Sequence, residues 1–303
     1  MQSIKTKVLT VFMSVIMVVS MFPALGSAAA SQSGNCGAQG TNVKFNLTND
    51  GTMTISGTGA MADFTYDAKA NYTNIPWYSN RTSIKKVIIK DGVTHIGSFS
   101  FVWCSQIKEI VWPTSGCVKS IGKAAFYECN GLPTIQIPYG VISVGYQAYA
   151  YCRSATTISL PNTLKTIAYG AFANCDLRTV YLPASVTTIG HFGFRGNYKM
   201  TKFSGGAGLI TIGTQAFEHC WKLSYFAITS KKLKKIGKAC FLCCSNLKTI
   251  YIKKTTKLTK KGVKNSMYLS SVKKVKVKKS KVKKYKKYFT YRNCAKRGVK
   301  VKK

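Results

Sequence analysis

The sequence is poor in acidic residues. Only 8 of its 303 residues are Asp or Glu, against 46 Lys and Arg, so the formal net charge is +38. The last carboxylate side chain is Glu218, and residues 231–303 contain 28 basic residues and no acidic one. A surface with so large an excess of positive charge attracts polyanions at long range, and this attraction weakens as salt is added.

Groups suited to catalysis are also scarce. The 3 histidines fall at different positions of the repeat described below, and no Cys–His or Ser–His–Asp arrangement stands out. Hydrolysis of sugars would need two converging carboxylates. Asp50 and Asp91, however, lie in the turn sequences NDG and KDG, and Glu109 and Glu128 lie in different predicted elements. We therefore expect no enzyme, no catalytic residue and no cofactor.

Long apolar runs are confined to the N-terminus. Lys5 and Lys7 precede the apolar run Val8–Phe22, and the small residues ALGSAAA follow it. This order is typical of a secretory signal peptide, with cleavage expected after Ala28 or Ala30. An uncleaved anchor is the alternative, but the run is shorter than the roughly 20 residues that span a bilayer. With no later span and no lipidation cysteine beside the cleavage site, we expect a protein that is secreted, extracellular or held non-covalently at a cell surface.

Most of the remaining chain is a repeat. One frame returns every 22 to 25 residues, approximately L-x-x-I-x-[IL]-P-x-x-V-x-x-I-G-x-x-A-F-x-x-C. Its first position falls at Ile84, Ile107, Leu132, Ala155, Leu177, Met200, Leu223, Leu247 and Val272. One unit cannot bury its apolar groups alone, but stacked units form a continuous core. The pattern predicts a solenoid of about nine units of about 23 residues.

Each part of the frame predicts a local structure. The L-x-x-I-x-I segment predicts a short strand with one buried face, which the following Pro ends. A second short strand ends at Ile-Gly, where a Cβ would obstruct a tight bend. The A-F-x-x-C segment supplies an aromatic plug to the core. Three departures stand out: Ala168 replaces Gly, Asn197 replaces Cys, and the eighth unit (LTKKGVKNSM) is degenerate.

These recurring motifs resemble the BspA-type leucine-rich repeat family, which is common in exported bacterial proteins. The segments DGTMTISGTGAMADF and IPWYSNRTSIKKVIIKDGVTHIG are similar to the N-terminal cap that often precedes such arrays. Cap and repeats together cover roughly residues 36–271. The resemblance implies a leucine-rich repeat solenoid that is mainly β with short helical turns. For some relatives it also implies surface adhesion and interaction with a host or a microbial community.

The expected organisation is a signal peptide (1–30), an N-terminal β cap (31–83), the repeat array (84–271) and a lysine-rich C-terminal cap (272–303). We predict a basic strand–helix–strand structure for the last segment, because VKVKK occurs at both of its ends, one repeat period apart.

Within the C-terminal cap the sequence predicts one helix between the two strands. Ser280 is the candidate cap of this helix and Gly298 its candidate end. Val282, Tyr285 and Tyr288 or Phe289 would share one face, with the lysines on the solvent side. A disordered basic arm is the alternative.

Six of the 11 cysteines occupy the same position of the repeat: Cys104, Cys129, Cys152, Cys175, Cys220 and Cys244. Stacked coils would place them in one internal column, where free thiols are favoured, although neighbouring coils are close enough for a bridge. His219–Cys220 and Cys243–Cys244 align one repeat apart, but consecutive residues point in different directions. We therefore expect no metal site.

A binding face is better supported by the sequence. The third and fifth positions of the L-x-x-I-x-I strands should face outward and form columns, and repeat proteins commonly bind through such faces. Exposed Tyr beside Lys or Arg is favourable contact chemistry. The candidate ligand-binding residues are Arg178, Tyr181, Lys202, Tyr225 and Tyr251. The alternative is that Thr and Tyr recur only because they are good strand residues.

The C-terminal lysines form a second candidate site, for anionic polymers. They are Lys273, Lys274, Lys276, Lys278, Lys279, Lys283, Lys284, Lys286 and Lys287. The expected partners are cell-wall or host anionic polymers, host surface proteins, or both. We expect a monomer, and we expect no intracellular nucleic acid among its ligands. Solvated charge that protects the end of the solenoid from polymerising is the alternative. The competing function is a structural, wall-associated spacer whose repeats bind no specific ligand.

Overall fold

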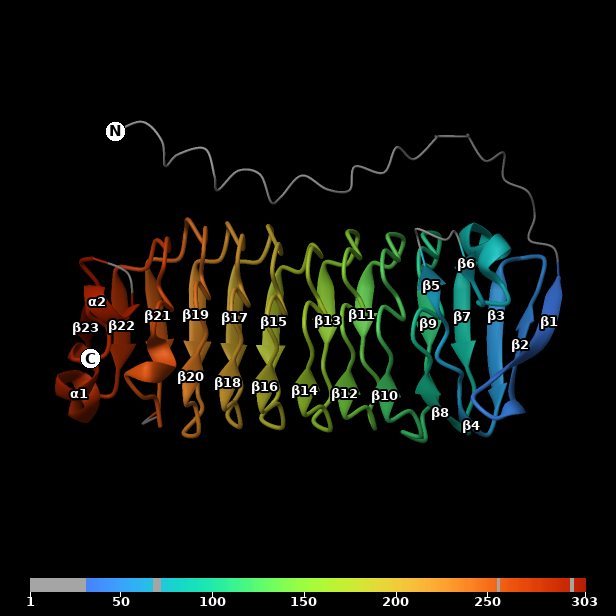
Figure 1. Cartoon of the computed structure of the whole chain (residues 1–303), viewed down its shortest axis with the longest axis horizontal. Helices are drawn as coiled ribbons and strands as arrows, with labels where there is room; N and C mark the ends of the chain where they lie inside the picture. Colours follow the sequence, from blue (N-terminus) through green and yellow to red (C-terminus); the bar gives the residue numbers. More distant parts are fainter. Residues whose placement is uncertain (1–30, 68–71, 255–256, 295–296) are drawn as a thin grey trace, which may run out of the picture.

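The chain forms an elongated solenoid whose coils stack along its long axis (Figure 1). This computed structural model describes residues 31–67, 72–254, 257–294 and 297–303. The predicted signal peptide lies outside the described residues. Within the described ranges, no helix is both long and apolar enough to cross a membrane.

Each coil contributes one strand to a row of longer strands, and the first seven coils also contribute one to a second, short-strand sheet. The longer strands are β7 (Lys86–Ile89), β9 (Glu109–Val111), β11 (Thr134–Gln136), β13 (Thr157–Ser159), β15 (Thr179–Leu182), β17 (Lys202–Gly205), β19 (Tyr225–Ile228), β21 (Thr249–Ile252) and β22 (Lys274–Val277). The short-strand sheet contains β8 (Val93–Ile96), β10 (Ser120–Ile121), β12 (Ser143–Val144), β14 (Thr166–Ile167), β16 (Thr188–Ile189), β18 (Thr211–Ile212) and β20 (Lys235–Ile236).

Neighbouring coils pair in parallel, with the same position of the repeat opposite itself. Ile135 of β11 pairs with Ile158 of β13, and Ile189 of β16 pairs with Ile212 of β18. Side chains at one position therefore stack into a column along the solenoid. The first position of the repeat is buried in all nine units, from Ile84 to Val272. The predicted mainly β solenoid is confirmed.

The aromatic plugs form a continuous stack at the centre of the core. Seven rings follow one another with centroid distances of 4.9 to 6.0 Å and small interplanar angles. They are Phe101, Phe126, Tyr149, Phe172, Phe194, Phe217 and Phe241, and all are fully buried. Offset stacks of this kind add to the stability that apolar burial gives.

The cysteine column makes a second repeated contact. The Sγ atom of Cys129 donates a hydrogen bond to the carbonyl oxygen of Phe101, the plug of the preceding coil, at 3.2 Å. Cys152, Cys175, Cys220 and Cys244 repeat this contact at 2.9 to 3.3 Å. All 11 cysteines are free thiols. The column therefore links coils through thiol–carbonyl hydrogen bonds, without disulfides.

The glycine of the Ile-Gly motif is required because the coils approach each other closely there. A Cβ on Gly213 would lie 2.4 Å from the backbone nitrogen of His191, and one on Gly237 would lie 2.4 Å from the backbone of Gly213. The predicted obstruction is confirmed. The obstructing atoms belong to the backbone of the preceding coil, and not to a tight bend within the same coil.

Two positions in the turns after the short strands adopt the left-handed backbone conformation. In one coil these are Gln147 (φ 50°) and Tyr151 (φ 63°). The backbone N–H of Tyr151 donates to the carbonyl oxygen of Ala173 in the next coil at 2.8 Å. A non-glycine residue in this conformation costs about 1–2 kcal/mol, which the hydrogen bond between coils helps to offset. This conformation sets the direction of the side chains on the outer edge of the turns.

The N-terminal cap joins the array through β3 (Thr52–Gly57) and β4 (Gly59–Ala60), which pair with β7 and β8. It also contains β1 (Gln32–Gly37), β2 (Gly40–Leu47), β5 (Tyr66–Asp67), β6 (Tyr72–Thr73) and a 3-10 turn (Tyr78–Ser83). The strands β1, β2 and β3 pair antiparallel, whereas β3 pairs in parallel with β7. Trp77 stacks on Phe101 at 5.7 Å. The cap thus continues both the sheet and the aromatic stack.

At the other end, β22 is followed by two short helices and a last strand. They are α1 (Val282–Lys286), α2 (Tyr291–Cys294) and β23 (Lys300–Lys302), with 3-10 turns at Lys261–Val263 and Lys279–Lys281. The strand β23 pairs in parallel with β22, so the predicted strand–helix–strand arrangement is confirmed. Tyr285 and Phe289 are buried, as their spacing predicts.

The helix between these strands differs from the prediction in two respects. Ser280 does not cap it, because Ser280 lies inside the 3-10 turn and α1 begins after Lys281 without a side-chain cap. The helix is also divided in two. The side-chain amide of Asn293 in α2 donates hydrogen bonds to the carbonyl oxygens of Lys260 and Tyr288, both at 2.8 Å, and so ties α2 to the eighth coil.

Candidate functional site

Four of the five predicted strand-face residues lie on the six-stranded sheet formed by β15, β17, β19, β21, β22 and β23. Tyr225 on β19 and Tyr251 on β21 stack with their ring centroids 5.2 Å apart, at an interplanar angle of 28°. Lys202 on β17 precedes Tyr225 in the same column. These three of the five predicted residues form one cluster.

The other two predicted residues lie apart from this cluster. Tyr181 is on β15, and Ser204 and Ala227 separate it from Tyr251 along the fifth-position column. It is the most exposed tyrosine of the described chain, at 73%. Arg178 lies just before β15 and is also exposed. The prediction that every fifth position faces outward fails at Ala227, which is buried.

Lysine side chains surround the stacked tyrosines. The Nζ atoms of Lys202 and Lys253 lie 5.7 and 5.9 Å from the centroid of the Tyr225 ring, and Nζ of Lys276 lies 5.9 Å from that of Tyr251. These distances are within the range of cation–π attraction. A shallow groove of about 520 Å³ runs beside Tyr251, between β21 and the C-terminal residues. The groove is lined by Tyr251, Ile252, Lys253, Lys254, Lys276, Val277, Lys278 and Lys303.

The lysines of β22 and β23 extend the same surface. Lys274 pairs with Lys300, and Lys276 pairs with Lys302, while Val275 between them is buried. Alternation along a strand therefore places the valines in the core and the lysines in solvent. We call the surface formed by Lys202, Tyr225, Tyr251, Lys253, Lys274, Lys276, Lys300 and Lys302 the basic sheet face. It joins three residues of the predicted strand-face site (Lys202, Tyr225 and Tyr251) to two lysines of the predicted polyanion site (Lys274 and Lys276) on one sheet.

All nine lysines predicted to bind polyanions are exposed. None of them forms an ion pair with a side-chain carboxylate among the described residues, where the lysine–carboxylate pairs are Lys86–Glu109 and Lys199–Asp176. Lys274 and Lys276 are on the basic sheet face. Lys273, Lys278 and Lys279 flank β22, and Lys283, Lys284, Lys286 and Lys287 surround the buried Tyr285 of the helical segment.

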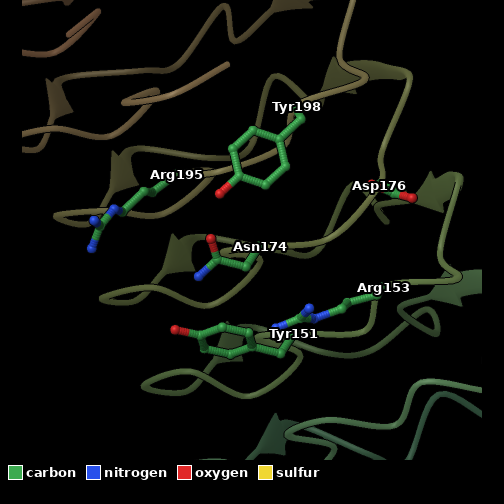
Figure 2. Close-up of a pocket in the computed structure, with 6 residues that line it drawn as sticks. All are labelled: Tyr151, Arg153, Asn174, Asp176, Arg195 and Tyr198. Carbon is green, nitrogen blue, oxygen red and sulfur yellow. The ribbon is translucent and has the colours of Figure 1, made fainter. Parts of the chain in front are cut away.

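A pocket that the sequence analysis did not predict lies on the outer edge of the turns (Figure 2). Its volume is about 420 Å³. We call it the loop-edge pocket, and it is lined by Tyr151, Arg153, Asn174, Asp176, Arg195 and Tyr198. Figure 2 shows Asn174 between Tyr198 and Tyr151, with Arg153 beside Tyr151, and with Arg195 and Asp176 on opposite sides of the group.

The hollow arises from two small residues at one position of the repeat. At the second left-handed position, Tyr151 and His219 have bulky side chains, whereas the two coils between them have Asn174 and Gly196. A Cβ on Gly196 would lie 2.0 Å from Oδ1 of Asn174, so Gly196 leaves room for the Asn174 side chain. In the sequence, this position lies immediately before the Cys or Asn of each unit. The change there from Tyr to Asn and Gly is the sequence signal that indicates the pocket.

The aligned pairs His219–Cys220 and Cys243–Cys244 can be compared with the requirements of a metal site. Among the described residues there is no group of three or more His, Cys, Asp or Glu side chains that could hold a metal ion. His219 instead contacts Glu218, with Nε2 3.6 Å from Oε1, and Nδ1 of its ring lies 3.4 Å from Nε1 of Trp221. Cys220 and Cys244 are buried, and burial raises the pKa of both thiols.

Comparison with known proteins adds a family and a fold. Residues 74–201 and 167–296 match the family described as BspA type leucine rich repeat region, in 6 copies. No curated protein matches the sequence significantly. A leucine-rich repeat protein from Bacteroides ovatus has a similar structure, with 21% identity and a TM-score of 0.51, over 86% of this chain and 75% of that one.

Two further solved structures are similar over much of their length. A leucine rich repeat protein of T. pallidum is 20% identical over 68% of this chain and 88% of that one, with a TM-score of 0.47. A leucine rich cell surface protein from Faecalibacterium prausnitzii is 21% identical over 86% of this chain and 93% of that one, with a TM-score of 0.37. The likeness in fold rests on the Bacteroides ovatus structure, whose TM-score is 0.51.

Proposed function

The chain belongs to the BspA type leucine rich repeat family, and on that premise we propose that it is an exported, surface-associated binding and adhesion protein. Its basic sheet face holds anionic polymers of a cell wall or of a host surface. The predicted signal peptide and the family support export and a surface location. The solenoid presents the binding face.

The observation that carries this proposal is the continuity of tyrosines and lysines on one sheet. Lys202, Lys253 and Lys276 lie over the rings of Tyr225 and Tyr251, and the lysine pairs of β22 and β23 follow without a break. Like charges directly opposite each other on paired strands are unfavourable. An anionic polymer lying along the sheet relieves this repulsion by neutralising several lysines at once.

The tyrosines give the face more than charge. Stacked aromatic rings supply rigid, partly apolar contact area, and Tyr is among the residues that dominate binding energy at interfaces. A solvated end cap requires lysines but has no need of a tyrosine pair beneath them. The pair therefore favours the binding function over a spacer whose lysines only keep the solenoid end soluble.

Truncating the cap is a poor test of this proposal. Ending the chain at Ser271 removes β22, whose Val275 and Val277 pair with the core strand β21, and it removes the buried Tyr285 and Phe289. The truncated protein loses core packing as well as charge, so failure to bind would have two explanations. Substitutions on the intact chain separate them.

The experiment uses the mature full-length chain and isolated bacterial cell walls, with retention followed across a salt gradient. The face variant changes Lys253, Lys274, Lys276 and Lys300 to Gln. The matched control variant changes Lys234, Lys235, Lys261 and Lys264 to Gln, four exposed lysines on the side of the short strands. Both variants lose four charges.

The face variant should elute at lower salt than the control variant, and Tyr225→Ala combined with Tyr251→Ala should weaken retention with no change of charge. Equal elution of the face and control variants would mean that total charge alone decides retention. Together with unchanged retention of the tyrosine variant, that result would favour the spacer function.

A further inference from the structure

We propose that the loop-edge pocket binds a carboxylate-bearing saccharide. This site shares no residue with the basic sheet face and does not depend on the proposed function of that face. Its volume of about 420 Å³ lies within the range of small-ligand sites in proteins. The pocket brings together two tyrosines, two arginines, a carboxamide and the carboxylate of Asp176 from three successive turns (Figure 2).

Two aromatic rings form walls of the pocket and are held in place by their neighbours. Tyr151 packs against Tyr127 with the ring centroids 5.3 Å apart, and Tyr198 packs against Trp221 at 4.5 Å. A pyranose ring has an apolar face of C–H groups, and a tyrosine ring with its negative face is a natural surface for it. Because both tyrosines are buttressed, little side-chain entropy remains to be lost on binding.

Arg153 supplies the charge that is free to meet a carboxylate. Arg195 forms an ion pair with the buried Glu218, with Nε 2.9 Å from Oε2, and Asp176 is paired with Lys199 at 2.7 Å. Arg153 has no carboxylate partner among the described residues, and its guanidinium lies 5.6 Å from the centroid of the Tyr151 ring. A guanidinium fork binds a carboxylate through two parallel hydrogen bonds.

Asn174 supplies the groups that recognise hydroxyls. Its side-chain amide forms no hydrogen bond with the described residues and lies between Tyr198 and Tyr151 in Figure 2. A carboxamide offers two donors and an acceptor, which suits the adjacent hydroxyls of a sugar. The hydroxyl groups of Tyr151 and Tyr198 add further donors and acceptors at the same opening.

The backbone around the pocket favours a saccharide over an extended peptide. The N–H groups of Tyr151, Asn174 and Gly196 already donate to carbonyl oxygens of the next coil at 2.7 to 2.8 Å. The N–H of Arg153 donates to Oδ1 of Asn130 at 3.3 Å. An extended peptide gains affinity from main-chain hydrogen bonds, which these groups cannot provide. A ligand of this pocket must therefore be recognised by side chains, which can bind the hydroxyl groups of a sugar.

The test compares methyl β-D-glucuronide with methyl β-D-glucoside, which lacks the carboxylate, by isothermal titration and ligand-observed NMR on the mature full-length chain. The glucuronide should bind about tenfold more tightly than the glucoside, which corresponds to one charge-assisted contact. Arg153→Gln should lower the affinity for the glucuronide about tenfold and leave that for the glucoside unchanged. Each sugar carries at most one charge, so the basic sheet face contributes little.

The matched control is Arg297→Gln, because Arg297 also lies over a tyrosine, 5.0 Å from the Tyr291 ring, but at the C-terminal end of the chain. It should change neither affinity. Three results would each overturn the proposal. They are equal affinities for the two sugars, equal effects of the two arginine variants, and no binding of the glucuronide at millimolar concentration. Tighter binding of a glutamate-containing peptide would identify a peptide site, and displacement by equimolar phosphate a simple anion site. Loss of wall retention in the face variant and loss of sugar binding in Arg153→Gln are separate readouts.

Discussion

The side-chain amide of Asn197 donates a hydrogen bond of 2.8 Å to the carbonyl oxygen of Phe172, the aromatic plug of the preceding coil. In the coils on either side a cysteine thiol makes the same contact. Asn197 also donates to the carbonyl oxygen of Phe194 at 2.9 Å, and its Oδ1 accepts from the N–H of Leu177 at 3.2 Å. Asn197 therefore replaces the cysteine of the repeat and keeps the hydrogen bond between coils, through a buried amide whose donors and acceptor are all used.

Removing this amide should destabilise the solenoid. We expect Asn197→Ala to lower the free energy of unfolding by about 2–4 kcal/mol, because it leaves buried backbone groups without partners and opens a cavity. Asn197→Cys should cost less, because a thiol restores the contact with Phe172. Urea denaturation followed by circular dichroism measures both. Asn162→Ala, at an exposed position, is the control, and an equal loss in the alanine and cysteine variants of Asn197 would contradict this interpretation.

The cysteine column makes a prediction about reactivity. Burial raises the pKa of the Cys104, Cys129, Cys152, Cys220, Cys240 and Cys244 thiols, and that of Cys36 to about 12. Because the thiolate is the reactive form, the native protein should show one fast thiol, the exposed Cys243, and a slower one, the half-buried Cys117.

A disulfide-exchange reagent at about pH 8 measures the fast thiols, and guanidinium should release the remainder together. Cys243→Ser is the control that removes the fast phase. Several fast thiols in the native Cys243→Ser variant would show that the column is open to solvent.

Stability at acid pH should depend on Asp63. Burial raises the pKa of this carboxyl. The hydrogen bonds from Ser98, one of them from its N–H at 2.7 Å, and the contact with His95 lower the pKa and outweigh the effect of burial. The pKa is therefore below its ordinary value of 3.8. The folded state therefore favours the charged form. Its contribution to stability is complete above the unfolded pKa and is lost as the pH falls through the lower, folded pKa.

We expect the thermal midpoint of unfolding to fall as the pH is lowered below about 4, and to fall less steeply in Asp63→Asn. Asp91→Asn, in an exposed turn, is the matched control. Parallel pH profiles for the wild-type protein and Asp63→Asn would contradict a role for this carboxylate.

Packing periodicity explains why the sequence predicted most of the fold. The first-position residues and the aromatic plugs must stack to be buried at all, so their spacing alone indicated a solenoid. The exchange of Cys for Asn at position 197 was visible too, but the hydrogen bond that makes it acceptable was not. The helix start at Ser280 was predicted wrongly, because local capping preference was outweighed by the 3-10 turn and by the side-chain bonds of Asn293.

The candidate sites were only partly visible in the sequence. The stack of Tyr225 on Tyr251 depends on a third-position residue meeting a fifth-position residue of the next strand, which requires the strand register. The loop-edge pocket depends on left-handed backbone at Tyr151 and Asn174, and this conformation is uncommon for residues other than glycine. Side-chain direction at such positions does not follow from hydrophobic periodicity.

The number of lysines that a polyanion neutralises on the basic sheet face can be counted directly. The measurement is the slope of log Kobs against log salt concentration for a defined anionic polymer, with the wild-type protein, the face variant and the control variant. Each lost contact should reduce the slope by about 0.7–0.9, so the face variant should lose about 3 units and the control variant less than 1. Equal slopes for the two variants would show that the polymer binds by net charge alone and that the basic sheet face is not the site.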